Sequence, residues 1–445
     1  MTPKTAPFHP QRAGFANGTS TPRAFLEACL ESLDVWEPRV GAFTVTALDS
    51  ARDAADAATA RWKAGRPLSA IDGMPVGIKD IIDTDDMPTQ MGSPLFAGSQ
   101  PRFSAASAQA LRDAGGVILG KTVTTEFAAT QPRGTRNPWA LDRTPGGSSS
   151  GSAAAVAAGM VSGALGTQVV GSIIRPAGFC GVHGYKPSVG GINRGGSLDY
   201  LSQSTTGTMG ASLGDTWIMA RAVAGLVGGD PGYAGLDGPV EPPAPARPAR
   251  LALLQTAGWP LLSEDAKASL HRALARLRAA GVEILTAETT PELAALEEAT
   301  AEALAITTVI NNWEWRWPLV GFMARDSLGL SPSSLERVAQ QGRMTRPDYL
   351  AALRRREAAR GAHAALAARC DAMVSVTAPG AAPMGLDWTG NPIFVVPGSL
   401  LGCPVVTLPV LLSEGLPLGL QLLGTRDNDA ALFALAAWVE AALAA

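Results

Sequence analysis

The amino-acid sequence predicts an α/β protein in which a large mixed, mostly parallel β-sheet is surrounded by helices. The chain has 445 residues, of which 46% are hydrophobic and only 17% are charged, a composition typical of a compact folded protein. Short apolar segments with the character of buried strands alternate with amphipathic helical segments. Such alternation is typical of a sheet that is covered by helices.

Helices are expected where apolar side chains recur with helical spacing, and strands where short apolar runs lie between turn residues. Thr21 precedes the first helical segment and is a typical N-terminal cap. We expect helices at residues 22–37, 47–64, 105–114, 263–280, 347–368 and 429–444. We expect strands at residues 75–82, 116–119, 250–255, 282–285 and 372–376, with further short strands between 402 and 423.

Composition also indicates which partners the protein lacks. The formal net charge of −3 provides no basic field for nucleic acid. The longest stretch of small and apolar residues, 153–166, is too short to span a bilayer, and the N-terminus lacks the apolar run of a signal peptide. The cysteines are widely spaced, which favours neither zinc nor disulfides and fits a cytoplasmic protein: Cys29, Cys180, Cys370 and Cys403.

Two regions are set apart by their composition. Residues 146–196 are rich in glycine and serine and contain few charges, so we expect them to bring backbone close to another group. Residues 228–250 are rich in proline and are interpreted as a surface connection. Residues 251–375 are interpreted as a more variable helical subregion.

Residues 115–122 match the phosphate-binding pattern GxxxxGK[ST], which requires a strand before the loop and a helix after it. Here a helix is expected before the match, and Val117, Ile118 and Leu119 occupy the position of the loop. Three large apolar residues favour a buried strand. We therefore interpret the match as accidental.

Residues 147–151 match GxSxG, the nucleophile elbow of α/β-hydrolases, with Ser149 as the nucleophile. That mechanism needs a histidine base, and the chain has only four histidines. His271 and His363 lie in predicted helices, and no convincing strand ends at Gly147. A Ser-His-Asp hydrolase therefore remains only an alternative.

Lys79 is a candidate general base because it lies in an apolar predicted strand, beside Ile78 and Ile81. Burial lowers the pKa of an ammonium group, so a buried lysine can accept a proton near neutral pH. The alternative is a lysine that extends to the surface or pairs with Asp80.

The surrounding motifs resemble those of the amidase signature family. Residues 144–152, TPGGSSSGS, resemble the family's TPGGSSGGSA loop, with Ser150 in place of a glycine. Residues 73–80 resemble its lysine strand. Further similarity is found at residues 120–127, 137–139, 402–409 and 415–421, so the resemblance extends from about Pro22 to the C-terminus. It implies that residues 1–445 form a single amidase domain.

The resemblance also implies a catalytic assignment. Ser172 corresponds to the nucleophile, Ser148 to a bridging serine in a cis peptide, and Lys79 to the base. Ser149 is expected to support the hydrogen-bond network. The oxyanion hole corresponds to the backbone amides of Val169, Val170 and Gly171. The resemblance implies cleavage of an amide C–N bond through an acyl-enzyme, without metal or cofactor.

The segment before the nucleophile departs from the family pattern GTDTGGSIR. Gln168 replaces an aspartate, and the arginine is displaced by one position to Arg175. We therefore expect that the usual Asp–Arg ion pair cannot form, and that Gln168 and Arg175 support the site differently. Val170 replaces a glycine, and a β-branched residue resists positive φ.

Trp313, Trp315 and Trp317 form the densest aromatic cluster in the sequence. Spacing by two would place all three on one face of a strand, where they could line the mouth of an apolar pocket. The alternatives are core packing and an exposed partner surface. A small apolar or aromatic amide is the expected substrate.

Four other functions remain possible at this point. A carbamate or ureide could be cleaved by the same residues, and a glutaminase component of a tRNA-dependent amidotransferase would require partner subunits. A Ser-His-Asp hydrolase and a non-catalytic binding protein on the same scaffold are the remaining two. The chain is expected to act on a small molecule, without nucleic acid or membrane, and a homodimer is one possible assembly.

Overall fold

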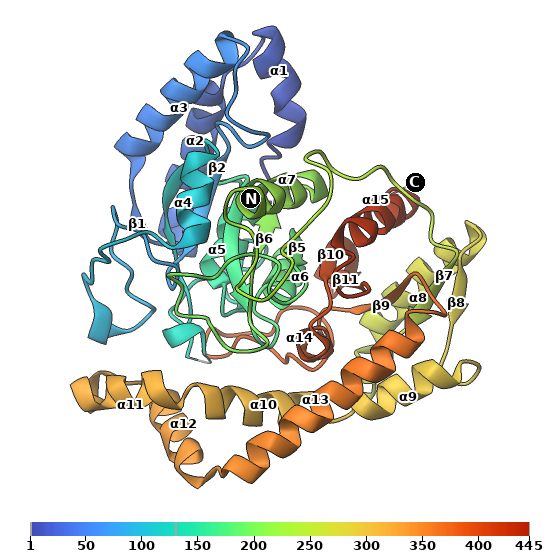
Figure 1. Cartoon of the computed structure of the whole chain (residues 1–445). Helices are drawn as coiled ribbons and strands as arrows, with labels where there is room; N and C mark the ends of the chain where they lie inside the picture. Colours follow the sequence, from blue (N-terminus) through green and yellow to red (C-terminus); the bar gives the residue numbers. More distant parts are fainter. Residues whose placement is uncertain (1, 130, 445) are drawn as a thin grey trace.

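The computed structural model describes residues 2–129 and 131–444, and within them one mixed sheet of eleven strands crosses the molecule (Figure 1). The strands lie in the order β1-β3-β2-β4-β6-β5-β10-β11-β9-β7-β8. Their bounds are β1 Phe43–Thr46, β2 Pro75–Lys79, β3 Val117–Thr122, β4 Gly163–Gln168, β5 His183–Lys186, β6 Thr205–Gly210, β7 Arg250–Leu253, β8 Glu283–Leu285, β9 Ala372–Val376, β10 Val405–Ser413 and β11 Leu416–Leu423. The α/β class and the mixed sheet are confirmed.

The expected majority of parallel strand pairs is wrong. Of the pairs between described strands, β2 runs parallel to β3 and β4, and β7 runs parallel to β8 and β9. The other six pairs are antiparallel. Two of these pairs, β5–β6 and β10–β11, are joined without an intervening helix, and short connections of this kind produce antiparallel neighbours. The β10–β11 hairpin, for example, turns at Glu414 and Gly415, which both have positive φ.

Six predicted helices are confirmed with small shifts at their ends. Thr21 caps the first of them by accepting a hydrogen bond from the amide of Ala24 at 3.1 Å. The six confirmed helices are α2 Pro22–Val40, α3 Leu48–Lys63, α4 Ala106–Asp113, α8 Glu264–Ala279, α13 Arg346–Leu366 and α15 Asp429–Ala444. The structure has further α-helices besides these six predicted ones: α1 Arg12–Asn17, α5 Ser150–Ala157, α6 Ile174–Cys180, α7 Leu213–Val227, α9 Pro291–Thr300, α10 Ala303–Glu314, α11 Arg316–Arg325, α12 Pro332–Arg343 and α14 Val396–Leu401.

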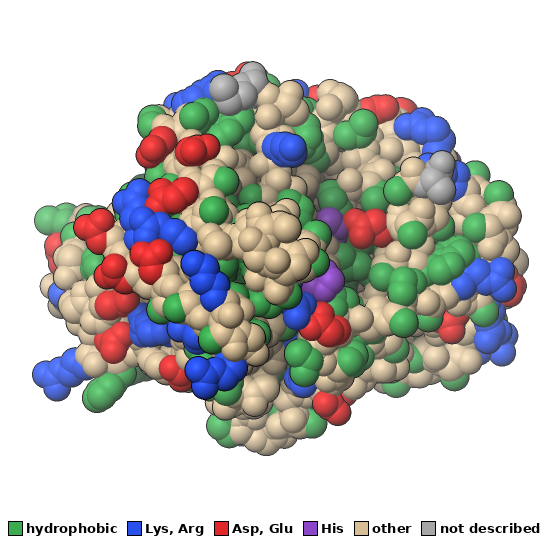
Figure 2. All heavy atoms as spheres, turned by 90° about the horizontal axis from the view of Figure 1, so that it is seen from above, with side chains coloured by type: hydrophobic (Ala, Val, Ile, Leu, Met, Phe, Trp, Pro, Cys, Tyr) green, Lys and Arg blue, Asp and Glu red, His purple; other side chains and the backbone are tan. Residues whose placement is uncertain are grey.

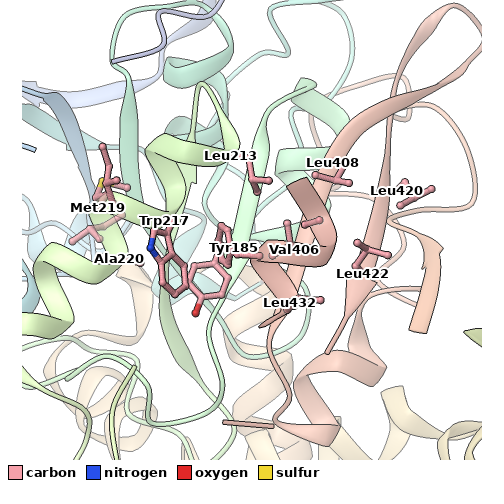
Figure 3. Packing of buried hydrophobic residues seen from close by; sticks show 14 of the residues in the cluster. Tyr185, Leu213, Trp217, Met219, Ala220, Val406, Leu408, Leu420, Leu422 and Leu432 are labelled. Carbon is pink, nitrogen blue, oxygen red and sulfur yellow. The ribbon is translucent and has the colours of Figure 1, made fainter. Parts of the chain in front are cut away.

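A large part of the core lies where α7 and α15 pack on the central strands (Figure 3). Trp217 of α7 and Tyr185 of β5 are fully buried there, near Val406 and Leu408 of β10. Burial of such aromatic side chains removes large apolar areas from water and fixes the helices on the sheet. The central strands therefore form a rigid support for the loops at their ends.

Small residues bring α5 close to the sheet. Ala153 and Ala154 are fully buried, and a Cβ atom on Gly151 would lie 2.1 Å from the carbonyl oxygen of Ala42. Only glycine fits at that position. The glycine-rich composition of this segment is thus explained by a close backbone approach, as predicted, and it holds the preceding serine loop against β3 and β4.

The proline-rich residues 228–249 contain neither helix nor strand and are mostly exposed. They connect α7 to β7. Helices α10, α11, α12 and α13 extend along one side of the molecule (Figure 1). Acidic and basic side chains are interspersed over the face seen from above (Figure 2). Within the described residues, no helix is both long and apolar enough to cross a membrane.

Candidate active site

Lys79 ends β2 and is fully buried. Its Nζ donates a hydrogen bond to Ser148 Oγ at 2.7 Å and to Thr167 Oγ1 at 2.8 Å, and lies 3.4 Å from the Thr167 carbonyl oxygen. Asp80 does not contact this amine, because its carboxylate pairs with Lys121 Nζ at 3.2 Å. Lys79 therefore neither reaches the surface nor pairs with its neighbour, and it meets hydroxyl groups instead.

The environment of Lys79 favours its neutral form. Burial lowers its pKa from 10.5 to about 7, against an opposing effect of the Asp199 carboxylate. The physical cause is the loss of hydration around the ammonium, which hydroxyl acceptors compensate only in part. An amine with a pKa near 7 can accept a proton at neutral pH.

Ser148 is held by the backbone on both sides of it. The peptide bond between Gly147 and Ser148 is cis. Arg175 Nη2 donates to the Gly147 carbonyl oxygen at 2.8 Å, and the amide of Thr125 donates to the Ser148 carbonyl oxygen at 3.1 Å. These contacts fix the position of the Ser148 hydroxyl beside Lys79.

Ser172 lies at the N-terminal side of α6 and lines a cavity. Its carbonyl oxygen accepts a hydrogen bond from the amide of Ser149 at 3.3 Å, so the two serine loops are joined. Ser149 Oγ lies 3.4 Å from both the amide and the carbonyl oxygen of Thr167. Among the described residues, no hydrogen bond joins the side chains of Ser148 and Ser172, so that link in the relay stays a prediction.

Gln168 organises the loop that precedes Ser172. Its Oε1 accepts from the amides of Ile173 at 2.9 Å and Ile174 at 3.0 Å. Its Nε2 donates to Ser399 Oγ at 3.0 Å, and Ser399 Oγ in turn donates to the Val170 carbonyl oxygen at 3.0 Å. A carboxylate could accept these amides but could not donate to Ser399. Gln168 thus supplies a donor that the family's aspartate lacks.

The two other departures also have simple structural consequences. Val170 is not among the residues with positive φ, so the β-branched side chain is accommodated without strain in the backbone. Arg175 forms no ion pair among the described residues; it donates to Gly147 and to Thr389 Oγ1 at 2.9 Å. Burial lowers its pKa to about 10. The displaced arginine therefore supports the Ser148 loop.

A cavity of about 300 Å³ opens in front of Ser172. Val169 and Val170 line it beside Ser172, and Phe127, Trp315 and Trp388 provide aromatic surface. The charged side chains at its wall are Arg175, Asp199, Glu336 and Arg337. The cavity is thus apolar over part of its surface and charged elsewhere, a combination typical of small-molecule sites.

The prediction that three tryptophans share one face of a strand is wrong. Trp313 and Trp317 lie in α10 and α11, and Trp315 lies between these helices. Trp315 is buried and lines the cavity, Trp313 stacks on Tyr349 with ring centroids 5.3 Å apart, and Trp317 is 79% exposed. Successive helical residues turn by about 100°, so a spacing of two separates side chains widely around the axis.

Glu126 fastens the cavity wall to helix α12. This fully buried carboxylate accepts from Ser334 Oγ at 2.6 Å, from the amide of Ser331 at 3.2 Å and from Arg133 Nη2 at 2.7 Å. Phe127, the next residue, lines the cavity. The sequence analysis missed four residues that contact Lys79, hold α12 or line the cavity: Glu126, Thr167, Asp199 and Arg337. Apart from the resemblance at residues 120–127, no sequence pattern indicates them, because the residues that they contact are distant in sequence.

Both accidental motifs have structural explanations. The phosphate-binding match contains β3, a fully paired buried strand, and its Lys121 binds Asp80 and Thr89 Oγ1. Ser149 has no hydrogen bond to a histidine among the described residues. His183 contacts Glu440 at 2.5 Å, and burial lowers the pKa of His363 to about 4. The strand that was predicted at residues 116–119, in place of a phosphate-binding loop, is therefore confirmed as β3.

Similarity to known proteins identifies the family to which the chain belongs. Residues 24–433 match the Amidase family. The chain is 31% identical to a glutamyl-tRNA(Gln) amidotransferase subunit from Roseiflexus castenholzii over 95% of this chain and 92% of that protein. The chain therefore belongs to the amidase family, and the amidase signature resemblance is confirmed.

Other similarities are partial or more distant. The corresponding glutamyl-tRNA(Gln) amidotransferase subunit from Chloroflexus aurantiacus is 42% identical over 221 residues, which are 48% of this chain and 45% of that protein. The alignment thus spans about half the length of this relative. The crystal structure of peptide amidase from Stenotrophomonas maltophilia is 29% identical, with a TM-score of 0.78 over 97% of this chain and 96% of that chain.

Proposed function

We propose that this protein hydrolyses an amide C–N bond with Ser172 as nucleophile, Ser148 as bridging serine and Lys79 as base. The main support is the hydrogen bond of 2.7 Å between a fully buried Lys79 amine and Ser148 Oγ. A lysine held only by hydroxyl and carbonyl oxygens has no carboxylate as a hydrogen-bond partner, and the more distant Asp199 offsets the effect of burial only in part. It is therefore suited to accept a proton.

In the proposed mechanism, neutral Lys79 takes a proton from Ser148 as Ser148 takes one from Ser172. Ser172 Oγ then attacks the substrate carbonyl carbon, and the backbone amides of Val169, Val170 and Gly171 stabilise the oxyanion. Ser148 passes its proton to the departing nitrogen and regains one from Lys79, which becomes neutral again, and the acyl group remains on Ser172. Water then attacks the acyl group and loses a proton to Ser148 as Ser148 gives one to Lys79. The protons return through Ser148 to Ser172 Oγ as the acid departs.

The dimensions of the cavity favour a small substrate. A volume of about 300 Å³ lies at the lower end of the range for small-molecule sites. Trp315 and Phe127 provide aromatic contact surface at its wall, which suits an apolar or aromatic amide. A carbamate or ureide of similar size could react by the same steps.

A second candidate is glutamine as substrate, with partner subunits. Two observations favour it: the names of the amidotransferase relatives, and the guanidinium of Arg337. Arg337 lines the cavity, donates through Nε to Asn312 Oδ1 at 2.7 Å and has no carboxylate within 4.0 Å among the described residues. A free carboxylate on the substrate would complement it.

Covalent labelling tests the proposed nucleophile. A sulfonyl fluoride is expected to modify Ser172, and peptide mapping by mass spectrometry would locate the adduct. The Ser172→Ala variant serves as control and should remain unlabelled. Labelling of Ser149 in its place would instead support a Ser-His-Asp hydrolase, and no labelling at all would favour a binding protein.

A substrate screen separates the remaining alternatives. Anilides, primary amides, carbamates and glutamine would be incubated with the isolated chain, and release of amine or ammonia measured. We expect primary amides or anilides to be hydrolysed fastest. Hydrolysis of glutamine alone, and only when partner subunits copurify, would favour the amidotransferase function.

A further inference from the structure

Asp199 is a buried carboxylate at the wall of the proposed substrate cavity. It is 4% exposed, and it lines the same cavity as Ser172, Trp315 and Arg337. Ser204 Oγ donates to its Oδ1. Its Oδ2 receives no hydrogen bond from any described residue. A carboxylate oxygen in this position is available to a molecule in the cavity.

No cation of the described chain neutralises Asp199. Within the described residues, no lysine, arginine or histidine nitrogen lies within 4.0 Å of it, although Arg337 lines the same cavity. Asp199 is nevertheless near enough to oppose the lowering by burial of the pKa of Lys79 and of Arg337. A buried carboxylate without a cation is costly, and the cost increases when a substrate displaces water from the cavity.

The contacts of the Asp199 backbone explain its position but not its charge. Its carbonyl oxygen accepts from Arg194 Nη1 at 3.2 Å, and its amide donates to Ser197 Oγ at 3.3 Å. Any residue other than proline could make these backbone contacts. The carboxylate itself has only the Ser204 hydroxyl, a partner that an asparagine side chain could also accept from.

We propose that Asp199 determines specificity by binding an amino group of the substrate, so that amides bearing a primary ammonium near the scissile bond are preferred. This inference rests on the proposed function of the cavity. A charge-assisted hydrogen bond to Asp199 Oδ2 would replace the water lost on binding. Apolar parts of the same substrate would contact Trp315 and Phe127.

A matched pair of ligands tests the proposal. L-phenylalaninamide and 3-phenylpropanamide differ only in the α-amino group, which is largely protonated at pH 7. Calorimetric titration of the Ser172→Ala protein measures binding without turnover. We expect L-phenylalaninamide to bind at least about tenfold more tightly, as a charge-assisted hydrogen bond at a desolvated site would produce.

The variants identify the residue responsible. Asp199→Asn, in the Ser172→Ala background, should remove the preference for the amino compound while leaving the affinity for 3-phenylpropanamide unchanged, which also shows that the cavity is intact. Glu336→Gln is the matched control, because Glu336 is a cavity carboxylate that is exposed and already accepts from Gln340 Nε2 at 3.3 Å. It should retain the preference.

Three results would overturn the proposal: no measurable binding of L-phenylalaninamide at millimolar concentration, equal binding of the two amides, or a preference that survives Asp199→Asn. Turnover of the two amides by the unmodified protein is measured separately. An amino preference in binding without any hydrolysis would contradict the proposed function and leave Asp199 as an amine-binding residue. Hydrolysis without preference would contradict only the role of Asp199.

Discussion

Two buried lysines on neighbouring strands show how partners decide what a lysine can do. Lys79 on β2 and Lys121 on β3 belong to parallel strands that pair directly, and both are fully buried. Lys121 Nζ contacts the Asp80 carboxylate at 3.2 Å and Thr89 Oγ1 at 2.6 Å. Lys79 contacts hydroxyl and carbonyl oxygens only.

Burial lowers the pKa of both lysines, but the carboxylates oppose this effect at Lys121. Asp80, Asp83 and Asp86 all raise the pKa of Lys121, so its charge has compensation nearby. At Lys79 the Asp199 carboxylate opposes the effect of burial on the pKa, but it is not a hydrogen-bond partner of the amine. Equal burial therefore produces a structural ion pair at one site and a candidate base at the other.

The largest effect is expected from Lys79→Met. Loss of the proposed base should lower kcat by about 10³-fold, within the range for general-base catalysis, because Ser148 then has no proton acceptor. The protein should remain folded, since an apolar side chain of similar length removes a buried amine. Steady-state kinetics and the thermal midpoint measure the two effects, and activity within tenfold of the unmodified protein would exclude the proposed base.

Lys121→Met should instead lower stability. It leaves Asp80 buried without its cation, and such a loss typically reduces the free energy of unfolding by about 3–5 kcal/mol. Urea denaturation measures this change. Adding Asp80→Asn to the Lys121→Met variant should restore part of the lost free energy of unfolding, because the unpaired charge is removed. A stable single variant that has lost catalysis would reverse the roles assigned to the two lysines.

The pH dependence of kcat/KM should reflect the pKa of Lys79. A base with a pKa of about 7 is protonated and inactive below that pH, so the rate should fall about tenfold per pH unit below 7. Above pH 7 the amine is neutral and the rate should be level. Initial rates between pH 5 and 9 test this. A profile that is still rising at pH 9 would show that Lys79 keeps an ordinary pKa.

The smallest effect is expected from Thr167→Val. This isosteric change removes the hydroxyl that accepts from Lys79 Nζ at 2.8 Å but retains the contact with Ser148. Loss of one hydrogen bond of about 1 kcal/mol should lower kcat roughly fivefold. The kcat of Ser152→Ala, which removes another buried hydroxyl of the same region, is measured as a control. An unchanged kcat in Ser152→Ala would show that the effect of Thr167→Val comes from the lost contact with Lys79 and not from a general disturbance of the site. A loss as large as that of Lys79→Met would mean that Thr167 itself transfers protons.

Much of the fold followed from local pattern. The long amphipathic helices and the buried strands were predicted within a few residues, because their periodicity is strong. The direction of the strands was not predicted correctly, because it depends on which strands become neighbours in space. The tryptophan segment was misread because Glu314 and Arg316, which lie between the tryptophans, complete an alternating pattern typical of a strand, whereas the segment lies where α10 ends and α11 begins.

The site was predicted in the parts that carry motifs. Lys79, Ser148 and Ser172 lie in segments with a recognisable order of residues, and the structure brings Lys79 and Ser148 into contact. Asp199 and Arg337 could not be predicted, because an unpaired charge in a cavity is defined by what surrounds it in space. The single domain, the possible homodimer and the cytoplasmic location stay predictions.

The network around Glu126 limits how the substrate range of this protein could be altered. Glu126 directly precedes Phe127 of the cavity wall, and its carboxylate holds the start of α12 through Ser331 and Ser334. Exchanges at the start of α12 would therefore also disturb the part of the wall that Phe127 forms. Engineering of a wider pocket is better begun at Trp315 or Trp388, which line it without contacting this carboxylate.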